Sequence, residues 1–158
     1  MRRKYPGLPI IGVGGIVFHE DQILLVKRGN EPALGQWSIP GGVVHTGETL
    51  KEAVVREVLE ETHLEVEVLA LAKVLERIFR EPDGRVAYHY VLVDFLCRRK
   101  AGKLKSGSDA QDALFASLQD LSPYQLATVT LEVINHADRL RKNPEIFHSP
   151  SGIGNFYG

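Results

Sequence analysis

The chain has 158 residues, of which 44% are hydrophobic and 25% are charged, a composition typical of one globular domain. Its formal net charge is −1. Proteins that bind nucleic acids or membrane surfaces usually carry a basic excess, so this balance argues against both kinds of partner. The single cysteine, Cys97, excludes an intrachain disulfide. With no signal-type apolar segment, the sequence predicts a cytoplasmic protein.

The first half of the chain predicts two strands and a helix. Apolar runs at residues 10–18 and 22–27 are joined by a short polar turn, which is typical of a hairpin. A loop at residues 29–35 and a short apolar stretch at residues 37–40 lead to a Gly-Gly pair. Residues 49–62 then predict a helix, because Thr49 and Glu52 have the spacing of a capping box.

The second half begins with two longer predicted strands, residues 64–75 and 86–97, separated by a turn signal at residues 81–84. The second of these strands is apolar at both alternating registers, so we expect it to be central and covered on both faces. Cys97 lies in its apolar run and is expected to pack rather than react. A polar loop at residues 98–109 and a strand at residues 114–118 follow.

A second helix is predicted to begin at Ser122, with Pro123 in the first turn and Gln125 completing a capping box. One apolar stripe follows at helical spacing: Leu126, Val129, Val133, Ala137 and Leu140. Strands around one helix, with a second helix after them, predict an α/β fold in which a mixed sheet is covered on both faces. We expect residues 1–142 to form a single domain and residues 143–158 a mobile or draped tail.

Three glutamates share one face of the first predicted helix. Glu57, Glu60 and Glu61 stand at positions i, i+3 and i+4, so their side chains lie within an arc of about 100°. Close carboxylates repel one another, and a hard cation with oxygen ligands relieves that repulsion. The alternative is a solvated acidic face with Arg56 paired to Glu60, and for the three acids alone the two interpretations are evenly balanced.

The surrounding residues favour the metal site. Residues 42–48, then seven residues, then residues 56–64 resemble the Nudix box: a glycine, five residues, a glutamate, seven residues, and Arg-Glu-apolar-any-Glu-Glu-any-Gly-apolar. Residues 37–41 also resemble the segment that precedes this box. The resemblance extends over most of residues 8–141 and implies the α/β/α sandwich of the Nudix family, with a mixed β-sheet.

One defined position departs from the box. His63 stands where the family has glycine, directly after the helix end, where a positive φ is favoured. Histidine tolerates that conformation less easily than glycine, and we expect a cost of about 1 kcal/mol. The substitution removes no carboxylate.

The resemblance implies a role for each residue of the box. Glu57, Glu60 and Glu61, with the carbonyl oxygen of Gly42, would bind Mg²⁺ or Mn²⁺. Glu48 would lie near the metal, and Arg56 would orient the carboxylates through an ion pair. The catalytic residues would be Arg56, Glu57 and Glu61, with Glu57 as first candidate for the general base and Asp109 as second.

Residues outside the box suggest how a substrate is chosen. Arg28, at the end of the second strand, is a candidate phosphate ligand, and Asp109 is a candidate substrate contact from its polar loop. The side chain of Trp37 is expected to pack beside the Gly-Gly pair rather than to stack on a base. Asp94 lies in an apolar strand, where an ionised carboxylate needs a partner. Residues 106–110 resemble a segment of a bacterial subgroup of ADP-ribose pyrophosphatase-like Nudix proteins.

These features predict a metal-dependent hydrolase that cleaves the pyrophosphate bond of a nucleoside diphosphate linked to another group. ADP-ribose, giving AMP and ribose 5-phosphate, is the first choice of substrate. One alternative is a nucleoside triphosphate pyrophosphohydrolase, which would share the metal chemistry. The other is a nucleotide sensor without hydrolytic activity, although such a protein would be expected to lack some of the acids. The resemblance is also compatible with a homodimer.

Overall fold

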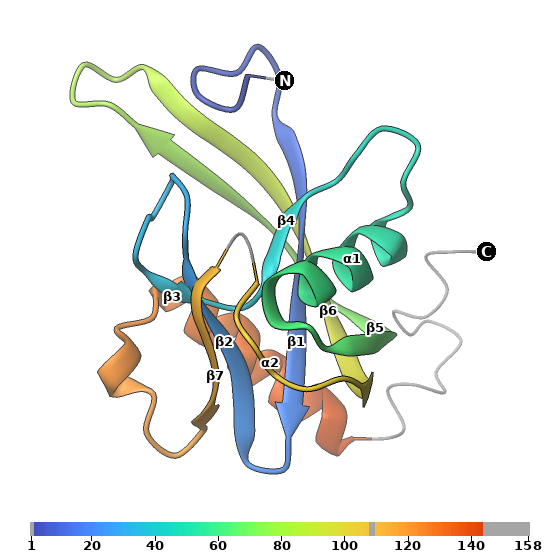
Figure 1. The fold of residues 1–158 in the computed structure, drawn as a ribbon. Helices are drawn as coiled ribbons and strands as arrows, with labels where there is room; N and C mark the ends of the chain where they lie inside the picture. The colour runs from blue at the N-terminus through green and yellow to red at the C-terminus, as the bar shows by residue number, and fades with distance from the viewer. Residues whose placement is uncertain (1, 108–109, 144–158) are drawn as a thin grey trace.

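A computed structural model describes residues 2–107 and 110–143. Within these residues the chain alternates strands with two α-helices and one 3₁₀ turn (Figure 1). The strands are β1 (Ile10–His19), β2 (Gln22–Arg28), β3 (Trp37–Ser38), β4 (Gly41–Val43), β5 (Glu65–Arg80), β6 (Val86–Ala101) and β7 (Ala110–Ser117). The helices are α1 (Leu50–Thr62) and α2 (Thr128–Lys142), and the 3₁₀ turn is η1 (Ser122–Tyr124).

Strand β1 organises the sheet. It runs parallel to β6 from Ile10 to Val17 and antiparallel to β4 over Gly12–Gly14. Its last two residues pair with β2, which in turn pairs with β3 and β7. Strands β5 and β6 form a long antiparallel hairpin at the other edge. The predicted mixed sheet and the central position of β6 are therefore confirmed.

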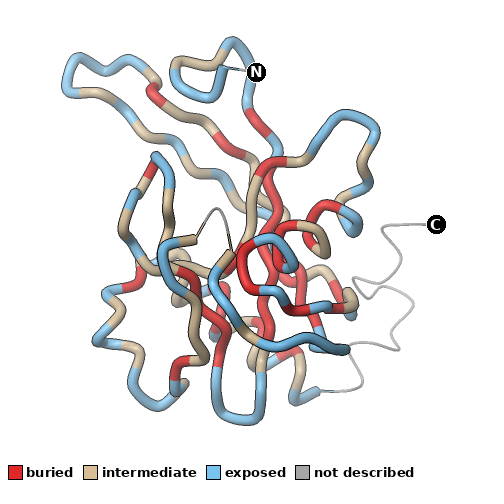
Figure 2. Tube along the Cα trace, in the orientation of Figure 1, coloured by how far each residue is buried: buried red, intermediate tan, exposed pale blue. Residues whose placement is uncertain are grey.

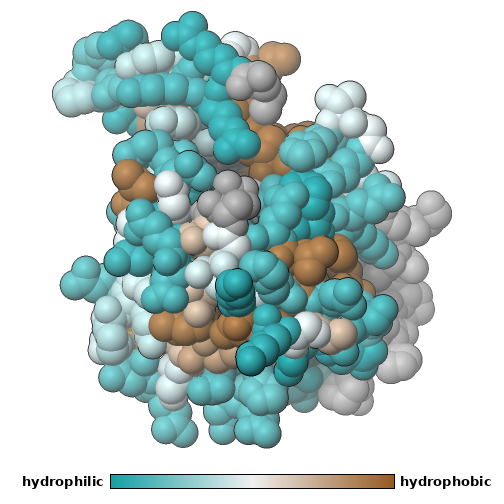
Figure 3. All heavy atoms as spheres, in the orientation of Figure 1, coloured by the Kyte–Doolittle hydropathy of each residue, from teal (hydrophilic) through white to brown (hydrophobic). Residues whose placement is uncertain are grey.

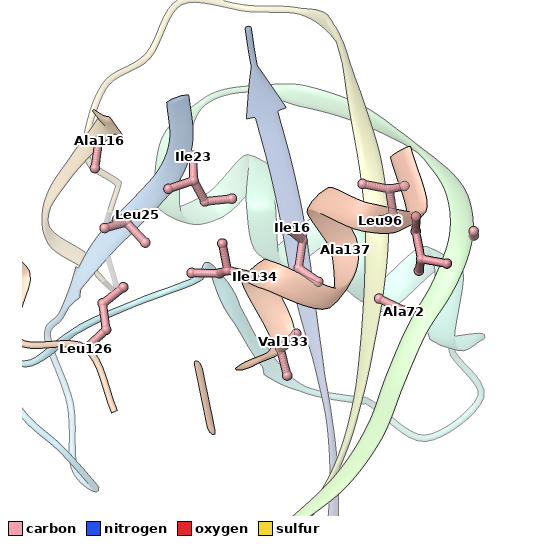
Figure 4. Close-up of a cluster of buried hydrophobic side chains, with 12 residues drawn as sticks. Ile16, Ile23, Leu25, Ala72, Leu96, Ala116, Leu126, Val133, Ile134 and Ala137 are labelled. Carbon is pink, nitrogen blue, oxygen red and sulfur yellow. The ribbon is translucent and has the colours of Figure 1, made fainter. Parts of the chain in front are cut away.

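The two faces of the sheet carry separate apolar clusters, because neighbouring residues of a strand point to opposite faces. Val17 packs with Val54 and Val58 of α1, whereas Ile16 packs with Ile134 of α2. Figure 4 shows Ile134 and Val133 lying over the strand that carries Ile16. In Figure 1 α1 lies in front of the sheet and α2 behind it, so the predicted α/β/α arrangement is confirmed.

The β5–β6 hairpin extends beyond both helices, at the upper left of Figure 1. Its tip is exposed in Figure 2, in contrast to the buried trace of β1. The same arm is largely hydrophilic in Figure 3. Both strands are longer than their apolar runs predicted, and residues 98–101, expected in a loop, belong to β6.

The second helix begins later than predicted. Ser122 does not cap it: Ser122–Tyr124 is a 3₁₀ turn, Gln125 is left-handed with φ 48°, and α2 starts at Thr128. The hydroxyl of Ser122 donates instead to Asp120 Oδ1 at 2.6 Å, so a local hydrogen bond replaces the expected cap. The predicted stripe is confirmed at Val133, Ala137 and Leu140, which are buried.

Two other expectations concern Cys97 and the membrane. Cys97 is buried, as predicted, and burial raises the pKa of its thiol to about 12. Among the described residues, no helix combines the length and the apolar character that crossing a membrane requires. Of the predicted tail, residues 143–158, all but Asn143 lie outside the described residues.

Candidate active site

Helix α1 is fixed at its start by the predicted capping box. The backbone N–H of Glu52 donates to Thr49 Oγ1 at 3.1 Å, and the backbone N–H of Thr49 donates to Glu52 Oε2 at 2.8 Å. Val54 and Val58 bury against the sheet. This orientation places Glu57 and Glu61 at the junction of α1 with the sheet, where their exposed fractions are only 7% and 6%.

Arg56 links the acids around it. Its guanidinium donates two hydrogen bonds to Glu48, at 2.6 and 2.9 Å. Nη1 also donates to Glu57 Oε1 at 2.7 Å and to Glu60 Oε2 at 3.3 Å. A further bond from Nη2 to the carbonyl of Val43, at 3.0 Å, ties the group to β4. Arg56 thus holds three carboxylates of the predicted box in one network.

This network also shifts protonation. The hydrogen bond from Arg56 is the largest cause that lowers the pKa of Glu48, which falls to about 2. The hydrogen bonds to Glu48 and Glu57 raise the pKa of Arg56 further above its ordinary value. The ion pair therefore stays charged across the range in which a hydrolase works.

The Gly-Gly pair allows the close approach of α1 to β4. A Cβ on Gly42 would lie 2.4 Å from Cδ of Glu57, and one on Gly41 would lie 2.1 Å from the carbonyl oxygen of Val13. The backbone N–H of Gly41 also donates to Glu61 Oε1 at 3.4 Å. Glycine at position 42 therefore lets the carboxylate of Glu57 approach the backbone, and glycine at position 41 lets β4 pack against the backbone of β1.

His63 adopts the conformation expected of the glycine that it replaces. Its φ is 61° and its ψ is 12°, and its backbone N–H donates to the carbonyl of Leu59. The side-chain Nδ1 lies 2.8 Å from the carbonyl oxygen of Lys105. The next segment closes over the helix end, because the backbone N–H of Gly107 donates to the carbonyl of Glu61 at 2.8 Å. The turn therefore forms with histidine in place.

A cavity of about 590 Å³ opens beside these carboxylates, a volume in the range of small-molecule sites. It is lined by residues of β1, β4 and α1, by most of residues 28–40, and by residues at the start of α2. One wall consists of alternate residues of two paired strands: Leu75, Arg77 and Phe79 of β5, and Tyr90, Leu92 and Asp94 of β6.

The structure places some of the predicted substrate-binding residues at the cavity, whereas another lies outside the described part of the chain. Arg28 lines the cavity, and its Nε donates to the carbonyl of Pro32 at 2.9 Å. Trp37 lines the cavity too and packs edge-on against Tyr124, with ring centroids 5.4 Å apart. Asp109 lies outside the described residues. Arg77 was not singled out by the sequence, because its alternation with Leu75 and Phe79 gains meaning only once the strand is placed.

The donor set suits a hard divalent cation. The guanidinium of Arg56 holds the carboxylates of Glu48, Glu57 and Glu60. Glu57 also lies against the backbone of Gly42, and Glu61 accepts from the backbone N–H of Gly41. In the described part of the chain, no three acid, histidine or cysteine side chains converge on one point as a metal cluster. Magnesium commonly takes one or two protein carboxylates and completes its shell with water and phosphate oxygens, so the residues present fit that ion.

Comparison with known proteins agrees with this geometry. The model of the NUDIX domain family matches residues 8–137. The chain is 42% identical over 113 residues to an ADP-ribose pyrophosphatase of Methanocaldococcus jannaschii, covering 72% of this chain and 64% of that protein. It is 33% identical over 121 residues to a putative ADP-ribose pyrophosphatase of Bacillus subtilis, covering 77% and 56% respectively. The chain thus spans less than two thirds of the length of these relatives.

The fold also resembles that of a solved structure. The crystal structure of an ADP-ribose pyrophosphatase from Streptococcus suis has a TM-score of 0.68 and 30% identity. The likeness covers 86% of this chain and 94% of that one.

Proposed function

Because the chain belongs to the NUDIX domain family, we propose that it hydrolyses the pyrophosphate bond of a nucleoside diphosphate linked to another group, with ADP-ribose as the substrate. The observation that carries the proposal is the arrangement of Glu57 and Glu61, both buried, beside the glycine backbone in the lining of the cavity. The 42% identity to an ADP-ribose pyrophosphatase supports the choice of substrate.

The family generally uses divalent metal ions, and we propose Mg²⁺ or Mn²⁺ here. Glu57, Glu60 and Glu61, together with the carbonyl oxygen of Gly42, would hold the ion, and Glu48 would lie just outside its shell. A bound cation would neutralise charge that develops on the pyrophosphate and favour ionisation of a water molecule.

The protein's own groups supply orientation and proton transfer. Arg56 holds Glu57 and Glu60 in place through charge-assisted hydrogen bonds. The carboxylate of Glu57 would accept the proton of the attacking water, with Asp109 as the alternative base. Arg28, on the cavity wall, would bind a phosphate oxygen of the substrate. The products would be AMP and ribose 5-phosphate, and we propose a cytoplasmic enzyme.

A substrate panel with Mg²⁺ tests this function. We expect hydrolysis of ADP-ribose, with kcat/KM at least about tenfold above that for nucleotide sugars, dinucleoside polyphosphates and nucleoside triphosphates. AMP and ribose 5-phosphate should appear in equal amounts in a chromatographic assay. Faster release of pyrophosphate from a nucleoside triphosphate would favour the alternative hydrolase. Tight binding of one compound with no turnover of any would favour a sensor.

A further inference from the structure

Asp94 is a buried acid in the wall of the cavity, and the proposed hydrolysis does not use it. Its side chain is 5% exposed, and it shares this wall with Tyr90 and Leu92 of the same strand. Its parallel neighbour in the sheet is Gly14. A Cβ on Gly14 would lie 2.3 Å from Asp94 Oδ1, so the absence of a side chain on β1 makes room for this carboxyl group.

Among residues 2–107 and 110–143, no hydrogen bond or ion pair to the carboxyl group of Asp94 is found. Its antiparallel neighbour Lys73 has its ammonium 4.0 Å from Glu132. The guanidinium of Arg56 is bound to the acids of α1. The other charged or titratable groups around the cavity are Arg3, Arg28, Glu31, Glu57, Glu61, Arg77 and Tyr90.

Burial is the sole cause that raises the pKa of Asp94, to about 7. Near neutral pH a large fraction of the group is therefore an uncharged carboxylic acid. Such an acid has one O–H donor and one carbonyl acceptor side by side. In the described part of the chain no fully buried side-chain oxygen lacks a hydrogen-bond partner, so the carboxyl group of Asp94 reaches the cavity that it lines. A ligand there can take the place of water as its hydrogen-bond partner.

The residues around Asp94 indicate which part of the substrate lies beside it. Apart from Arg77, whose guanidinium lies over the ring of Phe79, the side chains beside Asp94 in this wall are apolar or aromatic. Such a surface suits a flat base. The phosphates belong beside Glu57 and Glu61 of α1, where a cation held by these carboxylates would balance their charge. Adenine presents an amino N–H beside a ring nitrogen acceptor, the pattern complementary to an uncharged acid.

We propose that Asp94 recognises the base of the substrate, accepting a hydrogen bond from the amino group of adenine and donating one to the neighbouring ring nitrogen N1. The inference rests on the proposed function, since it assigns the base end of the same substrate. It makes Asp94 a specificity residue that takes no part in the cleavage of the pyrophosphate bond.

Binding of two nucleotides in metal-free buffer tests the inference without hydrolysis. AMP is compared with 1-deazaadenosine 5′-monophosphate, which has C–H in place of N1, and both dissociation constants are measured by calorimetry. Because the phosphates and sugars are identical, the ratio of the two constants isolates the contact to N1. We expect the wild-type protein to prefer AMP by about tenfold near pH 6.

Three variants and a pH series sharpen the test. In Asp94→Leu the preference for AMP should disappear, whereas Asp94→Asn, which keeps a donor and an acceptor, should retain it. Between about pH 6 and pH 9 the wild-type preference should vanish as the acid ionises, while that of Asp94→Asn stays constant. Asp21→Asn, an exposed matched control, should behave as wild type.

Other outcomes would overturn the inference. Equal weakening of both nucleotides by Asp94→Leu would mean that the acid contacts the sugar. A wild-type preference that is absent, or unchanged with pH, would also contradict it, as would a lack of AMP binding. Failure of the proposed function is seen separately, as absence of ADP-ribose hydrolysis with Mg²⁺ in a protein that still prefers AMP.

Discussion

Asp94 couples the stability of the fold to pH. Burial raises the pKa of its carboxyl group to about 7 in the folded chain, while in the unfolded chain the group keeps its ordinary value near 4. Below that ordinary value both states are protonated, and burial carries no charge penalty. As pH rises towards 7, the unfolded state ionises first, so the free energy of unfolding falls, and above 7 the full penalty applies.

We therefore expect Asp94→Asn to gain stability relative to wild type as pH rises from about 4 to 8, by up to roughly 4 kcal/mol. Urea denaturation of both proteins across this range measures the difference. Asp21→Asn, exposed in the β1–β2 turn, provides the control and should follow the wild-type curve. A stability difference between Asp94→Asn and wild type that stays constant with pH would refute this linkage.

For His63 the backbone conformation could be predicted from the sequence, but the partner of its side chain could not. Its position after the helix end predicted a positive φ, and the structure has φ 61° there. The compensating contact was not predictable, because Lys105, whose carbonyl lies 2.8 Å from Nδ1, is 42 residues away along the chain. Local backbone preference can be read from one residue, whereas its partner depends on the path of a distant loop.

The same contrast separates the two helices. Helix α1 could be predicted because its signals are local: the Thr49–Glu52 box and apolar residues at helical spacing. The start of α2 could not, because Ser122 and Gln125 fit a capping box equally well but the chain forms a 3₁₀ turn there. Strand β4 also has no local signal, since three residues form a strand only by pairing with β1.

Helix α1 also carries Glu61, one of the proposed metal ligands. Glu61→Gln should lower kcat for ADP-ribose by about a hundredfold or more, because an amide is a poor ligand for a hard cation. The fold should survive, since the amide oxygen can still accept from the N–H of Gly41. Glu65→Gln, an exposed glutamate in β5, is the matched control and should keep wild-type kcat. Near-normal turnover in Glu61→Gln, with circular dichroism unchanged, would remove Glu61 from the proposed ligand set.

The cavity belongs to the whole molecule, and the sequence alone could not have located it. Its walls come from strands β1, β4, β5 and β6, from α1 and from the start of α2. Asp94 was noticed in the sequence as an acid in an apolar strand, but its direction follows only from the register of β6 with β1. The box could be placed because its residues are contiguous, whereas the base-binding wall is assembled from two strands of a hairpin.

The molecule as a whole is stabilised by apolar packing on both faces of the sheet, shown for the α2 side in Figure 4. Arg56 of α1 already offsets the repulsion between Glu48 of the preceding loop and Glu57 and Glu60 of the helix. Neither contribution requires a metal ion. The proposed cation should therefore be necessary for hydrolysis and dispensable for folding, unlike the ion of a small domain that folds only when metal is bound.

Chelation separates these two roles. Treatment with EDTA should abolish ADP-ribose hydrolysis while the melting temperature, followed by circular dichroism, changes by less than about 3 °C. Adding Mg²⁺ back in excess should restore the full rate, because the folded scaffold and the Arg56 network have stayed in place. A large fall in melting temperature on chelation would show instead that the carboxylates of α1 depend on the ion for their positions. The Arg56 network would then be too weak to hold the site by itself.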